Sequence, residues 1–124
     1  AIAEAIPHMP LVLHGSSSVP QDLLQTINEF GGDIPVTYGV PTASIQAAIP
    51  HGVAKVNIDT DLRLAATAAV RQYLAQNPSN TDPRNYLHAA YSAMRAICEA
   101  RYRAFGSAGH AKRIMESQNE AHTT

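Results

Sequence analysis

Two short apolar runs along the chain each end in a cluster of polar residues. Leu11-Val12-Leu13 leads into His14-Gly15-Ser16-Ser17, and residues 53–58 lead into Asp59-Thr60-Asp61. Continuous apolar runs bounded by turn residues are typical of parallel strands that are buried on both faces. The pattern therefore predicts two buried strands, at residues 11–13 and 53–58, with polar groups at the carboxyl end of each.

Apolar positions at helical spacing predict helices between the two strands and after the second one. Asp82 followed by Pro83 is the clearest helix start, because Asp caps a helix and proline suits its first turn. We expect Pro50 to end the second helix early, since proline lacks a backbone donor. The predicted helices cover residues 21–30, 39–49, 62–76 and 83–105, and a polar, frayed tail follows at residues 107–124.

The order of these elements predicts an α/β fold in which the two strands pair in parallel through a right-handed crossover. Two parallel strands do not form a stable sheet alone, because both edges stay open and one face lacks cover. Residues 1–6 contain no initiator Met and have the pattern of a helix already under way. We therefore expect residues 1–124 to be the end of a larger α/β barrel or sheet, a single domain whose upstream part is missing.

Composition places the chain among globular proteins. The 124 residues are 45% hydrophobic and 15% charged, and the formal net charge of −1 does not favour nucleic acid or an anionic membrane surface. No apolar run reaches the ~18 residues of a membrane span, and no secretory signal opens the chain. The single cysteine, Cys98, excludes an internal disulfide. A cytoplasmic enzyme domain fits these features.

Both polar clusters fall where α/β sheets and β/α barrels build their active sites. His14 stands beside a small-residue turn whose backbone N–H groups can converge on an anion. Asn57 and Asp59 share one side of a strand, and Thr60 adds a hydroxyl that suits a phosphate. Each feature also has a structural explanation, as a satisfied His, a plain serine turn and a helix-capping cluster. The residues alone therefore indicate no more than a phosphate-binding face.

The remaining candidate groups are expected to be structural. The other histidines lack the spacing of metal ligands, and Cys98 lies on the apolar stripe of the long helix as a buried, inert thiol. The residues expected in the core are Tyr86, Tyr91, Tyr102 and Phe105. The residues expected on the surface or in loops are His8, His51, His88, His110 and His122.

Taken together, the two strand-end motifs resemble the carboxyl-terminal part of class II fructose-1,6-bisphosphate aldolases. The stretches that carry the resemblance are Leu-Val-Leu-His-Gly-Ser-Ser-Ser-Val-Pro at residues 11–20 and Lys-Val-Asn-Ile-Asp-Thr-Asp-Leu-Arg-Leu-Ala at residues 55–65. Residues 28–35 and 38–41 are similar to the longer loop of the Calvin-cycle-type bacterial branch, and Asp82-Pro83-Arg84 also matches. The resemblance covers nearly the whole chain. It implies that the chain forms the carboxyl-terminal part of a TIM (β/α)8 barrel, about strands seven and eight and the terminal helices.

This resemblance assigns roles to the polar residues at both strand ends. It implies that His14 is one ligand of a catalytic Zn2+ and that a monovalent cation, Na+ or K+, lies near the serine turn. Arg84 is expected to reach the second phosphate in a neighbouring subunit's site, which implies a homodimer or homotetramer. The implied substrate- and phosphate-binding residues are Gly15, Ser16, Ser17, Asn57, Ile58, Asp59, Thr60 and Arg84.

The implied reaction is metal-dependent cleavage of fructose 1,6-bisphosphate into dihydroxyacetone phosphate and glyceraldehyde 3-phosphate, or the reverse, in glycolysis, gluconeogenesis or the Calvin cycle. Such a zinc site needs about three protein ligands, and the family's other ligands and its proton-transferring Asp lie upstream. No catalytic residue is therefore expected in residues 1–124, which would be inactive alone. The alternatives are cleavage of tagatose or sedoheptulose bisphosphate, a generic phosphate-binding barrel, and a non-catalytic phosphate-binding or interaction fragment.

Overall fold

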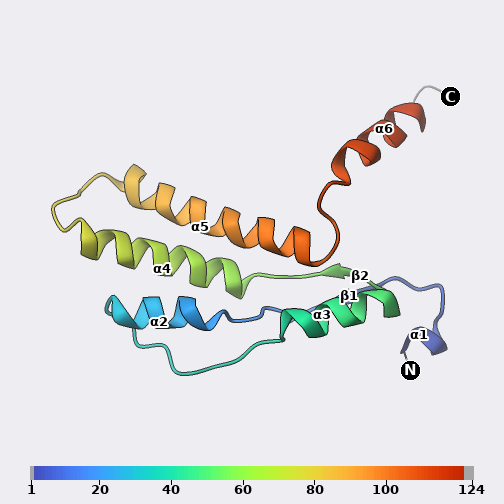
Figure 1. The fold of residues 1–124 in the computed structure, drawn as a ribbon, viewed down its shortest axis with the longest axis horizontal. Coiled ribbons are helices and arrows are strands. Elements are labelled where there is room, and N and C mark those ends of the chain that lie inside the picture. Colours follow the sequence, from blue (N-terminus) through green and yellow to red (C-terminus); the bar gives the residue numbers. More distant parts are fainter. Residues whose placement is uncertain (1, 122–124) are drawn as a thin grey trace.

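The computed structural model describes residues 2–121, in which helical segments flank two short strands (Figure 1). The order of helices and strands agrees with the expected α/β class. In chain order the elements are α1 (Ile2–Ala5), β1 (Leu11–Leu13), α2 (Gln21–Glu29), α3 (Thr42–Ala48), the 3-10 turn η1 (Ile49–His51), β2 (Val53–Val56), α4 (Thr60–Gln76), α5 (Pro83–Ala104) and α6 (Ala111–Ala121).

The two strands pair in parallel, as the sequence predicts. Val12 pairs with Lys55 and Leu13 with Val56, and the chain between the strands crosses over through α2 and α3. The Asn57 N–H then donates to the Leu13 carbonyl oxygen at 2.9 Å. Because pairing continues just past the end of β2, the loops at the two carboxyl ends are drawn together.

Both strands are less buried than the apolar pattern predicts. Neither contains a fully buried residue, and Val12 of β1 is 49% exposed. The prediction of strands covered on both faces is therefore wrong for the described residues. The reason is that a two-stranded sheet has two open edges, while the long helices pack mainly on one another.

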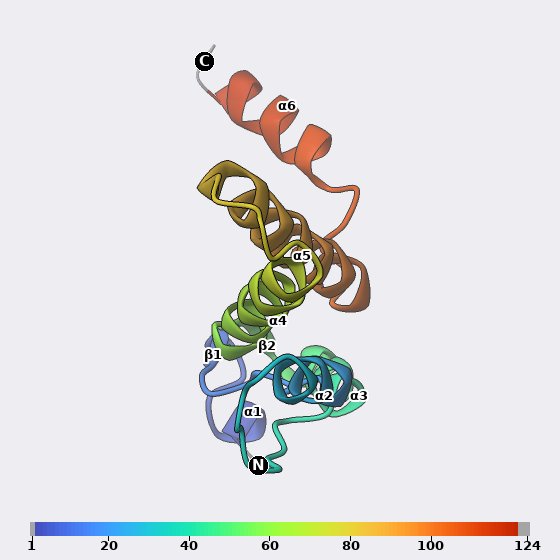
Figure 2. The ribbon, with the colours of Figure 1, turned by 90° about the vertical axis from the view of Figure 1, so that its left-hand side faces the viewer.

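The helices form a stack beside the small sheet. α4 packs against α5 as an antiparallel hairpin and against α2 on its other side (Figures 1 and 2). The buried apolar residues of α4 itself are alanines, Ala65 and Ala68. The buried apolar residues of these helices and of α3 are Leu24, Ile27, Ile45, Ala65, Ala68 and Ala90.

Two of the helix ends follow the signals expected from the sequence. Asp82 Oδ1 accepts from the Arg84 N–H at 3.0 Å, and Pro83 lies in the first turn of α5, which confirms this helix start. At Pro50 the helix gives way to η1, and Gly52 follows with a φ of +100° that suits glycine. α4 begins at Thr60, two residues before the predicted start at residue 62.

The expectations for the carboxyl-terminal part need correction. The segment expected to be a frayed tail contains α6, which points away from the other helices (Figures 1 and 2) and carries an i,i+4 pair between Lys112 and Glu116 at 3.8 Å. Tyr91 and Tyr102 are 58% and 59% exposed instead of lying in the core, and Cys98 is half-buried instead of buried. These side chains are accessible because α5 packs on α4 along one face only.

The remaining expectations agree with the structure in part. Tyr86 and Phe105, expected in the core, are only half-buried, whereas the outlying histidines at positions 8, 51 and 88 are exposed as expected and His110 is half-buried. His122 lies outside the described residues. None of the helices within residues 2–121 combines the length and the apolar character needed to cross a membrane.

Candidate functional site

An open pocket of about 440 Å³ lies at the carboxyl ends of both strands, and we call it the strand-end pocket. Its walls come from the loop after β1 (residues 14–19, the β1 loop) and from the segment between β2 and α4 (residues 57–59, the β2 loop). The structure thus brings together most of the residues that the sequence predicts for substrate binding. The lining residues are Gly15, Ser17, Val56, Asn57, Ile58, Asp59 and Thr60.

The β1 loop begins with a sharp turn. Gly15 has a φ of +63°, which glycine adopts without steric cost. Ser16 is buried, and its hydroxyl contacts the carbonyl oxygens of Leu13 at 3.2 Å and Asn57 at 3.0 Å. Ser16 therefore links the β1 loop to the β2 loop. Within residues 2–121 the backbone N–H groups of Gly15 and Ser17 have no acceptor. Free N–H groups beside a pocket suit a phosphate oxygen.

Ser17 joins the β1 loop to the first turn of α4. Its Oγ accepts from the backbone N–H groups of Thr60 at 3.1 Å and Asp59 at 3.4 Å. These donors open a helix of 17 residues, whose dipole favours negative charge at this end. An anion in the strand-end pocket therefore meets a helix N-terminus that Ser17 holds against the loop.

The chain ahead of α3 supports the β1 loop from behind. The Val40 N–H donates to the Ser17 carbonyl oxygen at 3.0 Å. A Cβ atom at Gly39 would overlap the same oxygen, so only glycine allows the two backbones to approach this closely.

A fully buried carboxylate, Asp61, holds the far end of the β1 loop. Its Oδ1 accepts from the Val19 N–H at 2.9 Å, and its Oδ2 accepts from the N–H and the hydroxyl of Ser18 at 3.1 and 3.0 Å. Arg101 of α5 approaches the same Oδ2, with Nη2 at 2.9 Å. Burial raises the pKa of Asp61, but the hydrogen bonds from these groups outweigh it, and the pKa lies below the ordinary value of 3.8.

His14 and Asn57 meet where the two strands end. Asn57 Nδ2 lies 3.0 Å from His14 Nδ1, and the imidazole is exposed. The same Nδ2 lies 3.5 Å from His14 Nε2, so the amide faces both ring nitrogens. An exposed imidazole can bind a metal ion through either ring nitrogen.

Comparison with known proteins reveals the family of this chain. The family model for class II fructose-bisphosphate aldolase matches residues 1–110. The chain belongs to this family. Fructose-bisphosphate aldolase of Pseudomonas aeruginosa is 62% identical over 109 residues, which are 88% of this chain and 31% of that protein. Class II aldolases are lyases of a (β/α)8 TIM-barrel fold, so the parallel pair of strands agrees with the family.

Further relatives show the same partial coverage. Fructose-bisphosphate aldolase of a Nostoc species is 55% identical over 115 residues, and fructose-bisphosphate aldolase class 2 of a Synechocystis species is 52% identical over 115 residues. Both alignments cover 93% of this chain and 32% of the relative. The chain thus spans about a third of the length of the curated relatives it matches.

Metal dependence is general in class II aldolases, and His14 is the residue that the sequence assigns as a metal ligand. His14 is exposed and contacts Asn57, one of the residues that line the strand-end pocket. Among residues 2–121, no three His, Cys, Asp or Glu side chains are grouped closely enough to hold a metal ion. The described residues therefore do not form a metal centre by themselves.

Arg84, the remaining residue of the predicted aldolase site, lies apart from the strand-end pocket. It stands at the start of α5, at the end of the α4–α5 hairpin remote from the strands (Figure 1), and its side chain is 88% exposed. Its Nη2 pairs with Asp82 Oδ2 at 2.6 Å, and this hydrogen bonding holds the pKa of Asp82 below its ordinary value. An exposed arginine at the tip of a hairpin can reach another molecule but does not contact its own pocket.

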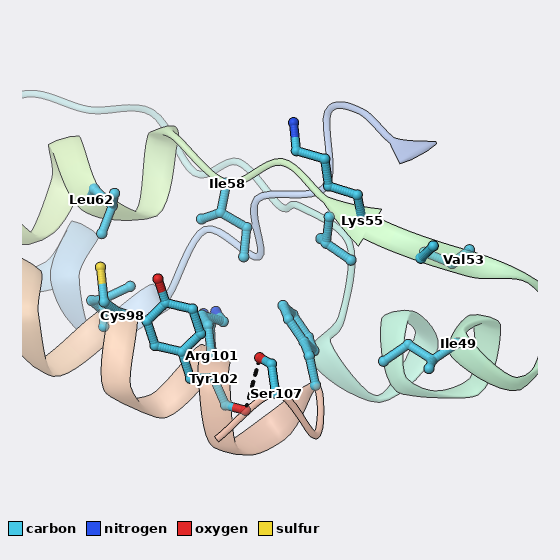
Figure 3. Close-up of a pocket in the computed structure, with 13 residues that line it drawn as sticks. Ile49, Val53, Lys55, Ile58, Leu62, Cys98, Arg101, Tyr102 and Ser107 are labelled. Atoms are coloured by element: carbon cyan, nitrogen blue, oxygen red, sulfur yellow. Dashed lines mark hydrogen bonds between the residues drawn. The ribbon is translucent and has the colours of Figure 1, made fainter. Parts of the chain in front are cut away.

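A second pocket, of about 480 Å³, separates β2 from the carboxyl-terminal half of α5, and we call it the apolar pocket (Figure 3). Its lining is mostly aliphatic and aromatic, and Arg101 forms part of its wall. Within the described residues Arg101 Nε is buried without a hydrogen-bond partner. Arg101 therefore reaches Asp61 from an apolar environment, in which that carboxylate is its ion-pair partner.

Sequence reasoning missed the role of Ser18, Asp61 and Arg101. The sequence predicts either a helix cap or a substrate contact for the run Asp59-Thr60-Asp61. Neither interpretation distinguishes Asp59, which is exposed, from Asp61, which is buried. A usable signal was present in α5, where Arg101 interrupts an apolar stripe. A lone arginine on such a face indicates a buried acidic partner.

Proposed function

We propose that this chain forms the phosphate-binding side of the active site of a class II fructose-bisphosphate aldolase, at about strands seven and eight of the barrel. The strand-end pocket carries this proposal. It gathers the β1 and β2 loops, although Ser17 and Thr60 are 43 positions apart, at the strand ends where barrel enzymes place their chemistry.

One phosphate of a ketose bisphosphate is proposed to bind between the β1 loop and the start of α4. The free N–H groups of Gly15 and Ser17 and the dipole of α4 provide positive potential there without a lysine or arginine in the pocket lining. Asp59 and Thr60 line the opposite wall, where they can accept and donate hydrogen bonds to substrate hydroxyl groups.

His14 is proposed as one of the ligands of a catalytic Zn2+, with a monovalent cation, Na+ or K+, near the β1 loop. When bound, the zinc ion would polarise the ketone oxygen and stabilise the negative charge that develops on carbon–carbon cleavage. The remaining ligands and the proton-transferring Asp are proposed to come from other parts of the enzyme. Asn57, adjacent to His14, is placed to donate to a substrate oxygen.

The proposed enzyme is a cytoplasmic homo-oligomer of the Calvin-cycle-type branch, a dimer or a tetramer. The exposure of Arg84 at the tip of the α4–α5 hairpin supports its assignment to the second phosphate in a neighbouring subunit's site. Such a contact would be charge-assisted and would be made only in the assembly.

The test is an aldolase assay on the gene product at its natural length. We expect EDTA-sensitive cleavage of fructose 1,6-bisphosphate, abolished by His14→Ala together with the loss of stoichiometric zinc. His51→Ala is the matched control, because His51 is also exposed but lies before the start of β2, away from the strand ends, and it should leave both zinc and activity unchanged. Full zinc content in His14→Ala would exclude the ligand role, and equal rates on the tagatose and sedoheptulose bisphosphates would contradict specificity for fructose.

A second candidate function is a phosphate-binding or interaction module without catalysis. The observation in its favour is that the described residues contain no group of three His, Cys, Asp or Glu side chains that could hold a metal ion. This alternative predicts phosphate binding without EDTA-sensitive cleavage, so the same preparation decides between the two.

A further inference from the structure

The β1 loop is held by an ion pair that links three separate parts of the fold. Asp61 lies in the first turn of α4, Ser18 in the β1 loop, and Arg101 near the end of α5. Asp61 Oδ2 contacts Arg101 Nη2 at 2.9 Å, and Arg101 also donates from Nη2 to the Ser18 hydroxyl. One carboxylate therefore joins the loop to both long helices.

Asp61 has no capacity left to bind substrate. Its side chain is fully buried, both of its oxygens accept from the groups just described, and it does not line the strand-end pocket. Removing such a charge from water is costly unless every lone pair is used. The hydrogen bonds of Asp61 therefore fix the conformation of the β1 loop.

The loop conformation that Asp61 holds is a strained one. Val19 has a φ of +52°, in the left-handed region. Among the residues that the structure describes, no other non-glycine residue has a positive φ. This conformation is unfavourable for a β-branched side chain. The bond from the Val19 N–H to Asp61 Oδ1 at 2.9 Å compensates for the strain at this position.

The clamped segment is adjacent to the groups that face the strand-end pocket. Ser18 directly follows Ser17, whose Oγ accepts from the Thr60 N–H at 3.1 Å and whose own N–H is free. A shift of Ser18 and Val19 would move Ser17 with respect to the start of α4. Hydrogen-bond donors misplaced by as little as about 1 Å lose much of their effect on a bound anion.

We propose that the buried Asp61–Arg101 pair positions the β1 loop for phosphate, so that α5 sets the affinity of the strand-end pocket for a phosphate ester. Asp61 and Arg101 are positioning residues, and neither touches the ligand. This inference rests on the proposed function, since it takes the strand-end pocket as the phosphate site.

The experiment compares Arg101→Met with wild type in the gene product at its natural length. Arg101→Met keeps most of the side-chain volume at the apolar pocket but removes the charge-assisted bond. We expect the KM for fructose 1,6-bisphosphate and the inhibition constant for inorganic phosphate to rise together by about tenfold, with kcat within about twofold. Arg101→Lys should recover part of the loss, because an ammonium group can still pair with Asp61.

Glu99→Gln is the matched control. Glu99 lies two positions before Arg101 on α5 and pairs with Arg95 at 2.8 Å, but this pair is exposed. The control should leave KM and the phosphate inhibition constant unchanged. Ser18→Ala provides a milder variant should Arg101→Met fail to fold, because it removes only the hydroxyl that contacts Asp61 and Arg101.

An unchanged KM and an unchanged phosphate inhibition constant in folded Arg101→Met, or in Ser18→Ala, would overturn the proposal. A loss of active protein with normal KM in the remainder would show a purely structural role and would overturn it equally. If the wild-type protein cleaved no ketose bisphosphate, the proposed function would fail separately. Calorimetry with inorganic phosphate would then still decide whether Arg101→Met weakens the strand-end pocket.

Discussion

Two aspartate–arginine pairs, whose aspartates lie at the start of α4, have nearly the same shortest N···O distance and opposite surroundings. Asp61 and Arg101 approach to 2.9 Å with side chains that are 0% and 17% exposed, whereas Asp59 and Arg63 approach to 2.8 Å with side chains that are 69% and 77% exposed. Since the two distances are nearly the same, burial decides what each pair contributes. The buried pair fixes the β1 loop, and the exposed pair leaves Asp59 accessible at the strand-end pocket.

The largest effect is expected from breaking the buried pair on its acidic side. Asp61→Ala would leave the Arg101 guanidinium uncompensated beside the apolar pocket and would remove the acceptors of Ser18 and Val19. We expect the free energy of unfolding to fall by about 3–5 kcal/mol. Urea denaturation of the gene product at its natural length measures this change.

The corresponding double variant sharpens this result. Asp61→Ala combined with Arg101→Met removes both charges, so no unpaired charge remains at the apolar pocket. The double variant should be more stable than Asp61→Ala alone. If it were less stable by the sum of both single changes, Asp61 and Arg101 would be independent, and the contrast with the exposed pair would lose its physical basis.

A smaller effect is expected from the other support of the β1 loop. Gly39→Ala would place a methyl group against the Ser17 carbonyl oxygen and force the two backbones apart. The hydrogen bond from the Val40 N–H to the same oxygen would then be disturbed. We expect a loss of about 1–3 kcal/mol in the free energy of unfolding, together with weaker inhibition by inorganic phosphate. Val36→Ala is the control, because Val36 is 76% exposed in the same connecting segment. Equal stability of both variants would show that the two backbones do not need this contact.

Acid should weaken the buried pair through protonation of Asp61. The pKa of Asp61 lies below 3.8, so this carboxylate contributes stability above its unfolded-state pKa and loses that contribution as pH falls through its folded-state pKa. Wild type should therefore lose stability on acidification in this range, and Asp61→Asn should lose less, since it has no carboxylate to protonate. Parallel pH profiles for the two proteins would contradict a lowered pKa at Asp61.

Much of the fold could be predicted from the sequence because local signals decide it. The strand starts, the parallel pairing and the start of α5 at Pro83 follow from apolar runs, crossover length and helix capping. The burial of the strands was predicted wrongly, since apolar character shows which residues favour burial but not whether a covering layer exists. α6 was missed because its sequence is polar on most sides.

The candidate site could likewise be predicted only in part from the sequence. Residues next to strand ends, such as Gly15 and Asn57, were found because their positions in the chain already place them at one edge of the sheet. The sequence could not distinguish the role of Asp61 from that of Asp59. Both lie at the start of α4, and the sequence does not say which side of that helix is buried. Arg101 is 40 residues from Asp61, and only the packing of α5 on α4 brings them together.

The smallest effect is expected from breaking the exposed pair. Arg63→Gln removes the partner of Asp59 but leaves both positions in water, where an i,i+4 pair contributes about 0.3–0.5 kcal/mol and is screened by salt. Unfolding in low and high salt measures this contribution, which should disappear at high salt, whereas the cost of Asp61→Ala should persist. A salt-independent loss of several kcal/mol in Arg63→Gln would mean that Asp59 is held as firmly as Asp61. Asp59 would then be a second clamp on the loops and would no longer be free to meet a ligand in the strand-end pocket.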